Sequence, residues 1–189
     1  MRLNNRYFAM RHGQSLANEQ GLIISDPANG LLAEYGLSET GQKQVRAAAR
    51  GADLPQTTLI FSSDFSRVQQ TAEIAREVFD ARTIILTPLL RERYFGNWEK
   101  TPNTNYEKIW QFDKQSADTH ENNVESLDAV LARTLQLIND IERNYQNKDI
   151  LLVSHGDTLQ ILQTGLAGMS LTKHRELPHL ETAEIRRLA

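Results

Sequence analysis

Two short segments of this chain place a histidine directly before a glycine and shortly after an apolar run. The first is "RHG" at residues 11 to 13, after "YFAM", and the second is "SHG" at residues 154 to 156, after "ILLV". An imidazole titrates near neutral pH and serves as a nucleophile, an acid or a base. The guanidinium of Arg11 offers planar, paired donors that match an oxyanion such as phosphate. The two segments therefore indicate chemistry on a phosphate group.

The elements around these segments alternate between apolar runs and helical patterns. A helix is expected over residues 38 to 50, because Ser38 is a good N-cap and Gly51 suits a helix end. Another is expected over residues 64 to 79, capped by Ser63 or Asp64. The remaining expected helices cover residues 126–145 and 157–166, and the expected strands cover residues 7–10, 58–61, 83–86, 150–153 and 183–188. This alternation predicts an α/β fold of three layers, α/β/α, around a mostly parallel central sheet.

A parallel sheet would bring the reactive residues together although they are far apart in the sequence. The carboxyl ends of parallel strands share one edge, and ligands bind in the crevice outside that edge. Arg11 and His12 follow the first strand, Arg67 lies in the first turn of the helix after the second, and His155 follows the strand at 150–153. We expect these four side chains to converge on one phosphate.

Length and composition fit one globular domain over residues 1–189. The chain has 40% hydrophobic and 24% charged residues, no cysteine and a formal net charge of −3. This charge gives no general attraction to nucleic acid or to an anionic membrane, and no apolar segment suggests a signal peptide or membrane span, so the protein is expected to be cytoplasmic. Residues 99 to 123 are polar and irregular, so a lid-like excursion is expected around residues 92–123.

Six motifs follow one another along the chain: "RHGQSLAN" at 11–18, "LSETGQKQ" at 37–44, "SSDFSRVQQTAEIA" at 62–75, "LLRERYFGNWE" at 89–99, "ESLDAVLAR" at 125–133 and "VSHG" at 153–156. This ordered set resembles the histidine phosphatase superfamily, the phosphoglycerate mutase-like proteins. The segment "LLRERYFGNWE" is more similar to the fructose-2,6-bisphosphatase-like branch of broad phosphatases than to the glycolytic mutases.

The resemblance implies a role for each central residue. His12 would be the nucleophile that takes up the phosphoryl group, and Arg11, Arg67 and a protonated His155 would surround the phosphate oxygens. Glu92 occupies the family position of the proton donor for the leaving group, a role that requires a raised pKa.

Further phosphate ligands follow from the same resemblance. Asn18 and the backbone amide of Gly156 would donate hydrogen bonds to the phosphate. Ser25 is a third candidate, although its loop lacks the hydroxyl-glycine pattern of many mutases, and a role in capping or turning that loop is the alternative. Gln14 stands where many relatives carry glutamate, which changes the local charge and leaves the chemistry intact.

Other residues have simpler interpretations. Glu92 has Arg91 and Arg93 as neighbours and Glu99 nearby, so a surface ion pair is the alternative to its role as an acid. Aromatic residues after Glu92 are expected to pack the excursion and to shape the pocket: Tyr94, Phe95, Trp98, Tyr106, Trp110 and Phe112. Three histidines are expected to be ordinary core or surface residues: His120, His174 and His179.

These residues predict a metal-independent phosphomonoesterase that acts on a small phosphorylated metabolite through phospho-His12. No metal and no cofactor is expected, because the arginines beside the histidines would repel a dication. A cofactor-dependent phosphoglycerate mutase is the first alternative, and it would need a bisphosphate primer. A phospho-ligand-binding protein with little turnover is the second, and it would have no need for the proton donor Glu92.

Overall fold

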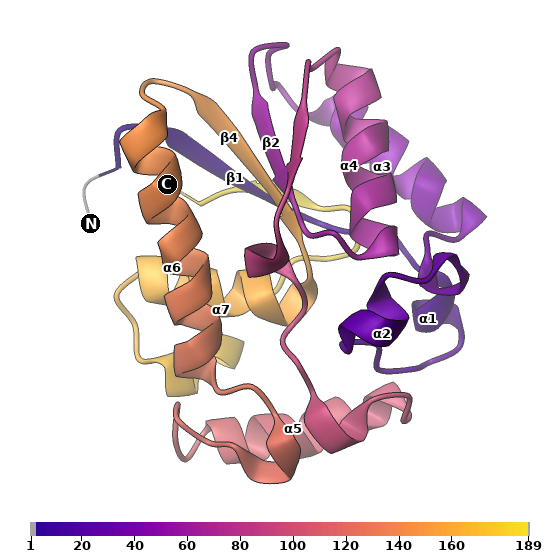
Figure 1. The fold of residues 1–189 in the computed structure, drawn as a ribbon, viewed down its shortest axis with the longest axis vertical. Coiled ribbons are helices and arrows are strands. Elements are labelled where there is room, and N and C mark those ends of the chain that lie inside the picture. The colour runs from indigo at the N-terminus through magenta and orange to yellow at the C-terminus, as the bar shows by residue number, and fades with distance from the viewer. Residues whose placement is uncertain (1–2, 189) are drawn as a thin grey trace.

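A twisted five-stranded sheet forms the centre of the computed structural model, which describes residues 3–188 (Figure 1). The strand order is β3-β2-β4-β1-β5, and only β5 runs antiparallel to its neighbour. The strands are β1 (Arg6–Arg11), β2 (Leu59–Ser62), β3 (Ile84–Leu86), β4 (Asp149–Ser154) and β5 (Ile185–Arg187). The four parallel strands therefore end at one common edge, as the ligand crevice requires.

Helices cover both faces of the sheet (Figure 1). The α-helices are α1 (Leu16–Glu19), α2 (Pro27–Gly30), α3 (Glu39–Gly51), α4 (Ser66–Phe79), α5 (Tyr106–Asp113), α6 (Leu127–Asn144) and α7 (Gly156–Leu166). Short 3-10 helices are η1 (Ala33–Tyr35), η2 (Pro88–Leu90), η3 (Gly96–Trp98), η4 (Asn103–Asn105), η5 (Glu121–Asn123) and η6 (Leu171–Glu176). No helix within residues 3–188 is long and apolar enough to cross a bilayer.

Strand β4 shows why the sheet holds two helical layers. All six of its residues are buried, and its apolar side chains alternate between the faces. Leu151 and Val153 join the core beneath α3 and α4, whereas Ile150 and Leu152 join the core beneath α6. A strand buried on both faces reads as a continuous apolar run, because each face needs its own hydrophobic partners. The predicted three-layer α/β fold is confirmed.

The structure confirms the expected strands and long helices with boundaries that differ by one or two residues, apart from the final strand. That strand is shorter than the expected 183–188 and is the antiparallel β5. Ser38 caps α3 as expected, accepting a hydrogen bond from the Gly41 amide at 3.2 Å. The expected cap of α4 is wrong: Phe65 is its N-cap residue, and no side chain caps the helix.

The excursion at residues 92–123 is more ordered than its polar sequence indicates. It contains α5 and three 3-10 helices, η3, η4 and η5. Phe95 and Ile109 lie in a small apolar core of their own together with Ile23. Figure 1 places α5 at one end of the molecule, beyond the edge where the parallel strands end. A few apolar anchors therefore fold a segment that is otherwise polar.

Candidate active site

The register of the sheet brings the two histidines together. Strands β1 and β4 are parallel neighbours in which Arg11 pairs with Ser154, so the next residues, His12 and His155, lie side by side. Their rings meet edge to face with centroids 5.3 Å apart. A backbone hydrogen bond of 3.0 Å from the His12 amide to the Ser154 carbonyl continues the ladder. Arg67 enters from the first turn of α4, which follows β2, and Glu92 enters from the segment after β3.

The ring of His12 is held in one tautomer. Its Nδ1 lies 2.7 Å from the Gly13 carbonyl oxygen, and only a protonated Nδ1 can donate to that oxygen. The lone pair is therefore on Nε2, which lies 3.3 Å from the Nε of Arg67. Burial and the nearby charges of Arg67 and Arg11 hold the pKa of His12 well below its usual value. The imidazole is neutral at pH 7 and has a nucleophilic nitrogen next to a guanidinium.

His155 has the opposite tautomer. Its Nε2 lies 3.1 Å from the Ser63 hydroxyl, and its Nδ1 accepts a hydrogen bond of 3.0 Å from Nη2 of Arg67. Burial and the charge of Arg67 hold the pKa of His155 well below its usual value. The ring is thus neutral here, and the family resemblance implies a protonated His155 where a phosphate is bound. A phosphate dianion beside Nδ1 would favour the protonated form, because an opposite charge raises a histidine pKa.

Two guanidinium groups at this edge have donors left over. Nη1 of Arg67 and Nε of Arg11 are buried and have no hydrogen-bond partner among residues 3–188. Other donors of these groups are used: Arg11 Nη1 bonds the Leu180 carbonyl at 2.8 Å, and Arg67 Nη2 bonds the Ile24 carbonyl at 2.9 Å. A buried cationic donor without a partner is costly, so this pair marks a place for an anion.

Glu92 is buried at the same edge. Its Oε2 lies 4.0 Å from Nδ1 of His155, and its Oε1 accepts a hydrogen bond of 3.0 Å from the Arg93 amide. Burial and then the charge of Asp157 raise the pKa of Glu92, while Arg67 opposes this effect. Raising the pKa favours the protonated carboxyl, the form that a general acid needs.

The neighbouring arginines do not form the surface ion pair with Glu92 that was the alternative to its role as an acid. Arg91 pairs with Asp64 at 2.6 Å, and Arg93 pairs with Asp113 at 2.7 Å. The carboxyl of Glu92 is therefore free to face the pocket.

The three further candidate phosphate ligands divide into two groups. Asn18 and Gly156 line the pocket with the histidine and the arginines, and Ser25 does not. The Ser25 hydroxyl donates to Glu99 at 2.8 Å and accepts from the Phe95 amide at 2.9 Å. Ser25 thus ties its loop to the excursion, which agrees with the alternative role of turning the loop.

Asn18 and Gly156 both have hydrogen-bond donors that a ligand in the pocket could use. Oδ1 of Asn18 accepts hydrogen bonds from the Ser15 amide and hydroxyl at 3.0 and 2.9 Å, which leaves the Nδ2 hydrogens for a ligand. Gly156 begins α7, where backbone amides attract anions. A side chain at position 156 would place its Cβ 3.3 Å from Nε of Arg11, so glycine keeps that guanidinium accessible.

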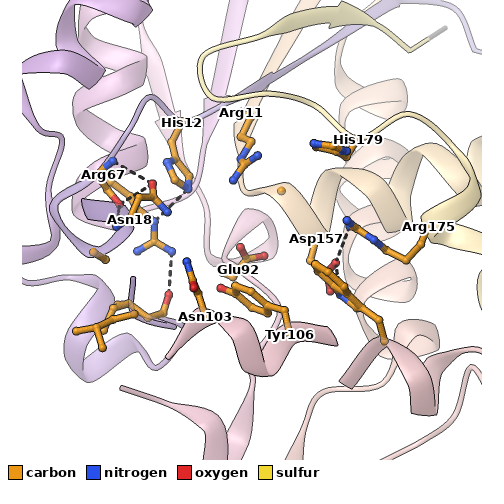
Figure 2. A pocket seen from close by; sticks show the side chains of 16 residues that line it. Arg11, His12, Asn18, Arg67, Glu92, Asn103, Tyr106, Asp157, Arg175 and His179 are labelled. Carbon is orange, nitrogen blue, oxygen red and sulfur yellow. Dashed lines mark hydrogen bonds and ion pairs between the residues drawn. The ribbon is translucent and has the colours of Figure 1, made fainter. Parts of the chain in front are cut away.

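Most of the candidate residues line a pocket of about 260 Å³ (Figure 2). We call five of them the floor of this pocket: Arg11, His12, Arg67, Glu92 and Gly156. Other elements supply what we call the outer wall: Asn103, Tyr106, Trp110, Asp157, Arg175 and His179.

The outer wall is built around Asp157. Trp110 of α5 donates to Oδ1 of Asp157 at 3.2 Å, and Arg93 reaches Oδ2 at the same distance. Arg93 also binds Asp113 of α5, so its buried guanidinium joins a carboxylate of the excursion to the carboxylate of Asp157 in α7. Arg93 lowers the pKa of Asp157, so this carboxylate is ionised beside Glu92.

Most of the outer wall was not found from the sequence. His179 lines the pocket, although the sequence suggested an ordinary role, while His174 is buried and His120 is exposed as expected. Asp157 had a local signal, because it follows "SHG" in the first turn of a helix. Arg175 had none, since its partner Trp110 is 65 positions earlier in the chain. No group of three or more His, Asp and Glu side chains within residues 3–188 is placed to hold a metal ion.

Curated proteins with similar sequences are named as phosphatases and mutases. A metal-independent phosphoserine phosphatase of Arabidopsis thaliana is 26% identical over 183 residues, covering 90% of this chain and 74% of that protein. A probable phosphoglycerate mutase of Photorhabdus laumondii is 30% identical over 177 residues, covering 90% and 78%. The relatives named as phosphatases support the assignment of this chain as a phosphatase.

Solved structures and family models agree with these relatives. A mycobacterial glucosyl-3-phosphoglycerate phosphatase, solved with VO3, matches with a TM-score of 0.79 at 25% identity, covering 95% of this chain and 90% of that one. The model of the histidine phosphatase superfamily, branch 1, matches residues 7–189. The chain therefore belongs to the histidine phosphatase superfamily.

Proposed function

We propose that this protein is a metal-independent phosphomonoesterase that removes the phosphoryl group of a small phosphorylated metabolite through a phospho-His12 intermediate. One observation carries the proposal: the lone pair of His12 Nε2 lies on the pocket floor beside two buried guanidinium groups with unpartnered donors. A neutral nucleophile surrounded by free cationic donors suits attack on a phosphate dianion. The whole chain would work as one domain, with residues 92–123 as its lid.

In the first step, Nε2 of His12 attacks phosphorus in line and forms a P–N bond. The bond from phosphorus to the leaving alkoxide breaks, and the proton of Glu92 passes to the alkoxide oxygen. Arg11 and Arg67 offset the charge on the three equatorial oxygens, where a loose transition state carries it. The raised pKa of Glu92 supports this step, because the carboxyl must begin protonated.

In the second step, water replaces His12 on phosphorus. The Glu92 carboxylate takes a proton from the water, the new P–O bond forms, and the P–N bond breaks to release inorganic phosphate. Glu92 is then protonated again and His12 is neutral, so both groups are ready for another turnover. A protein that only bound phosphorylated ligands would have no need for a buried acid such as Glu92.

The test is phosphate release in the presence of EDTA from a panel of phosphorylated sugars, glycerates, nucleotides and peptides. We expect turnover by the wild type, and the His12→Ala variant should lose it by at least about 10⁴-fold because the proposed P–N bond needs Nε2 of His12. Acid-labile and base-stable phosphoprotein, trapped by rapid quenching, should be present in the wild type alone.

Two other results would contradict the proposal. Turnover that EDTA abolishes would point to a metal-dependent reaction. Phosphoryl exchange with a bisphosphate primer, without net phosphate release, would identify the protein as a mutase.

A further inference from the structure

Arg175 stands out in the outer wall because its orientation is fixed while its donors are unused. Its guanidinium carbon lies 3.8 Å from the centroid of the Trp110 ring, a stacking contact that holds the planar group in place. Trp110 itself stacks on Tyr106, with ring planes 10° apart. Figure 2 shows Arg175 on the side of the pocket opposite Arg67. The aromatic stack thus presents the guanidinium to the pocket.

The carboxylate of Asp157, which lies beside Arg175, is held mainly by other groups. Nη1 of Arg175 lies 3.6 Å from Oδ1 of Asp157, too far for a hydrogen bond. The same oxygen accepts the 3.2 Å hydrogen bond of Trp110, and Oδ2 accepts that of Arg93. The guanidinium of Arg175 forms no hydrogen bond with residues 3–188, and its one polar contact there is the 3.6 Å ion pair with Asp157. Its five N–H groups therefore remain for a ligand.

Neutralisation of Asp157 alone does not account for this arrangement. An arginine that served only as a counter-ion would gain most from a direct, paired contact with the carboxylate. Arg93 makes such a contact with Asp113, through two hydrogen bonds of 2.7 and 2.8 Å. Arg175 instead is about a quarter exposed, with 27% of its side chain accessible, and lies on the pocket surface.

We propose that Arg175 is a specificity-determining residue, which binds a second anionic group, carboxylate or phosphate, on the substrate whose phosphoryl group lies on the floor. This inference rests on the proposed function. The substrate would then be a small metabolite with anionic groups at both ends, one for Arg11 and Arg67 and the other for Arg175. A planar guanidinium matches both kinds of anion through paired hydrogen bonds.

The test compares substrates that differ only in the second group. 3-Phosphoglycerate and glycerol 3-phosphate differ by a carboxylate against a hydroxymethyl group, and propane-1,3-diol bisphosphate and monophosphate differ by a phosphate. In one of the two pairs, we expect the wild type to have a kcat/KM about 10- to 100-fold higher for the substrate that carries the second anionic group. This is the range of a charge-assisted hydrogen bond. The pair that shows the preference distinguishes carboxylate from phosphate.

The Arg175→Gln variant should remove this preference. We expect its kcat/KM for the substrate with the second anionic group to fall about 10- to 100-fold. Its kcat/KM for the substrate that carries only the phosphoryl group should change less than about threefold. Arg175→Lys should restore part of the preference, because it keeps the charge and loses the planar, stacked donors. Lys173→Gln is the matched control: it removes a charge two positions away, on a side chain that is 58% exposed, and should change neither value.

Two results would overturn the inference. Equal losses on both members of a pair would show that Arg175 only supports the structure, and equal wild-type rates on both members of both pairs would show that no second anion is bound.

A binding measurement keeps the inference testable if no substrate is hydrolysed, a result that would contradict the proposed function itself. Calorimetry with 3-phosphoglycerate and with propane-1,3-diol bisphosphate would then compare the His12→Ala protein with the His12→Ala/Arg175→Gln protein. Weaker binding of either ligand by about tenfold in the double variant supports the role of Arg175, and equal binding of both rejects it.

Discussion

The floor and the outer wall of the pocket are built in different ways. The floor comes from the ends of four parallel strands, and backbone hydrogen bonds at the sheet edge fix Arg11 and His12 within it. The outer wall comes from η4, α5, η6 with the segment after it, and the first turn of α7. Buried charges join α5 to α7, and the stacking of Arg175 on Trp110 joins η6 to α5. The floor is thus part of the framework, whereas the wall depends on contacts between distant segments.

This difference suggests that the floor supports the reaction of any phosphomonoester and that the outer wall selects the substrate. In the proposed function, the floor carries the groups that any phosphomonoester needs, because its donors would surround one phosphate and Glu92 would be the acid beside them. The outer wall carries groups that only particular substrates would use. Substitutions in the floor should therefore affect all substrates alike, and those in the wall should discriminate among them.

Substitution of Arg67 should cause the largest loss of kcat/KM, and the loss should be the same for all substrates, as expected for a residue of the floor. Arg67→Met removes a donor to the equatorial oxygens, so we expect kcat/KM to fall about a thousandfold for every phosphomonoester. The melting temperature should be at least as high as that of the wild type, because a desolvated cation is replaced by an apolar chain of similar length. Arg76→Met, on the same helix and outside the pocket, is the control. A loss confined to one class of substrate would break the distinction between floor and wall.

Glu92→Gln should have the next largest effect, and its size should depend on the leaving group. For an alkyl phosphate we expect kcat/KM to fall about 100- to 1000-fold, because the alkoxide then leaves without a proton. For p-nitrophenyl phosphate the loss should be under about tenfold, since nitrophenolate leaves without help. Steady-state rates on both substrates provide the measurement. Equal losses would show that Glu92 is not the acid of the first step.

Asp157→Asn should cause the smallest change in kcat/KM. It tests whether the wall and the floor are independent, because Asp157 belongs to the outer wall and affects the pKa of Glu92 in the floor. The charge of Asp157 raises the pKa of Glu92, so its removal should lower that pKa. A general acid works below its pKa and is lost as the pH rises through it, so the alkaline limb of the kcat/KM profile should move to lower pH.

The matched control for Asp157→Asn is Asp118→Asn, because the Asp118 side chain is 76% exposed. Its pH profile should coincide with that of the wild type. An alkaline limb that stays in place in Asp157→Asn would mean that burial alone sets the pKa of Glu92.

The floor was predictable because short segments determine it. A strand, a histidine and a glycine follow one another at residues 7–13 and again at 150–156, and parallel pairing then brings the two segments together. The cap of α4 and the helix α5 were not predictable in this way. Phe65 begins α4 without a capping side chain, and the packing of Ile109 and Phe95 stabilises a segment of polar sequence.

The sequence by itself determined the fold class, the family resemblance and the residues that meet at the sheet edge, because each follows from local patterns and their order. Tertiary structure alone decided the ionisation of the two histidines, which burial and Arg67 make neutral. It also decided the placing of Arg175, which depends on a tryptophan from α5. Burial and contacts between distant segments arise only when the chain folds, so neither property can be read from a local pattern.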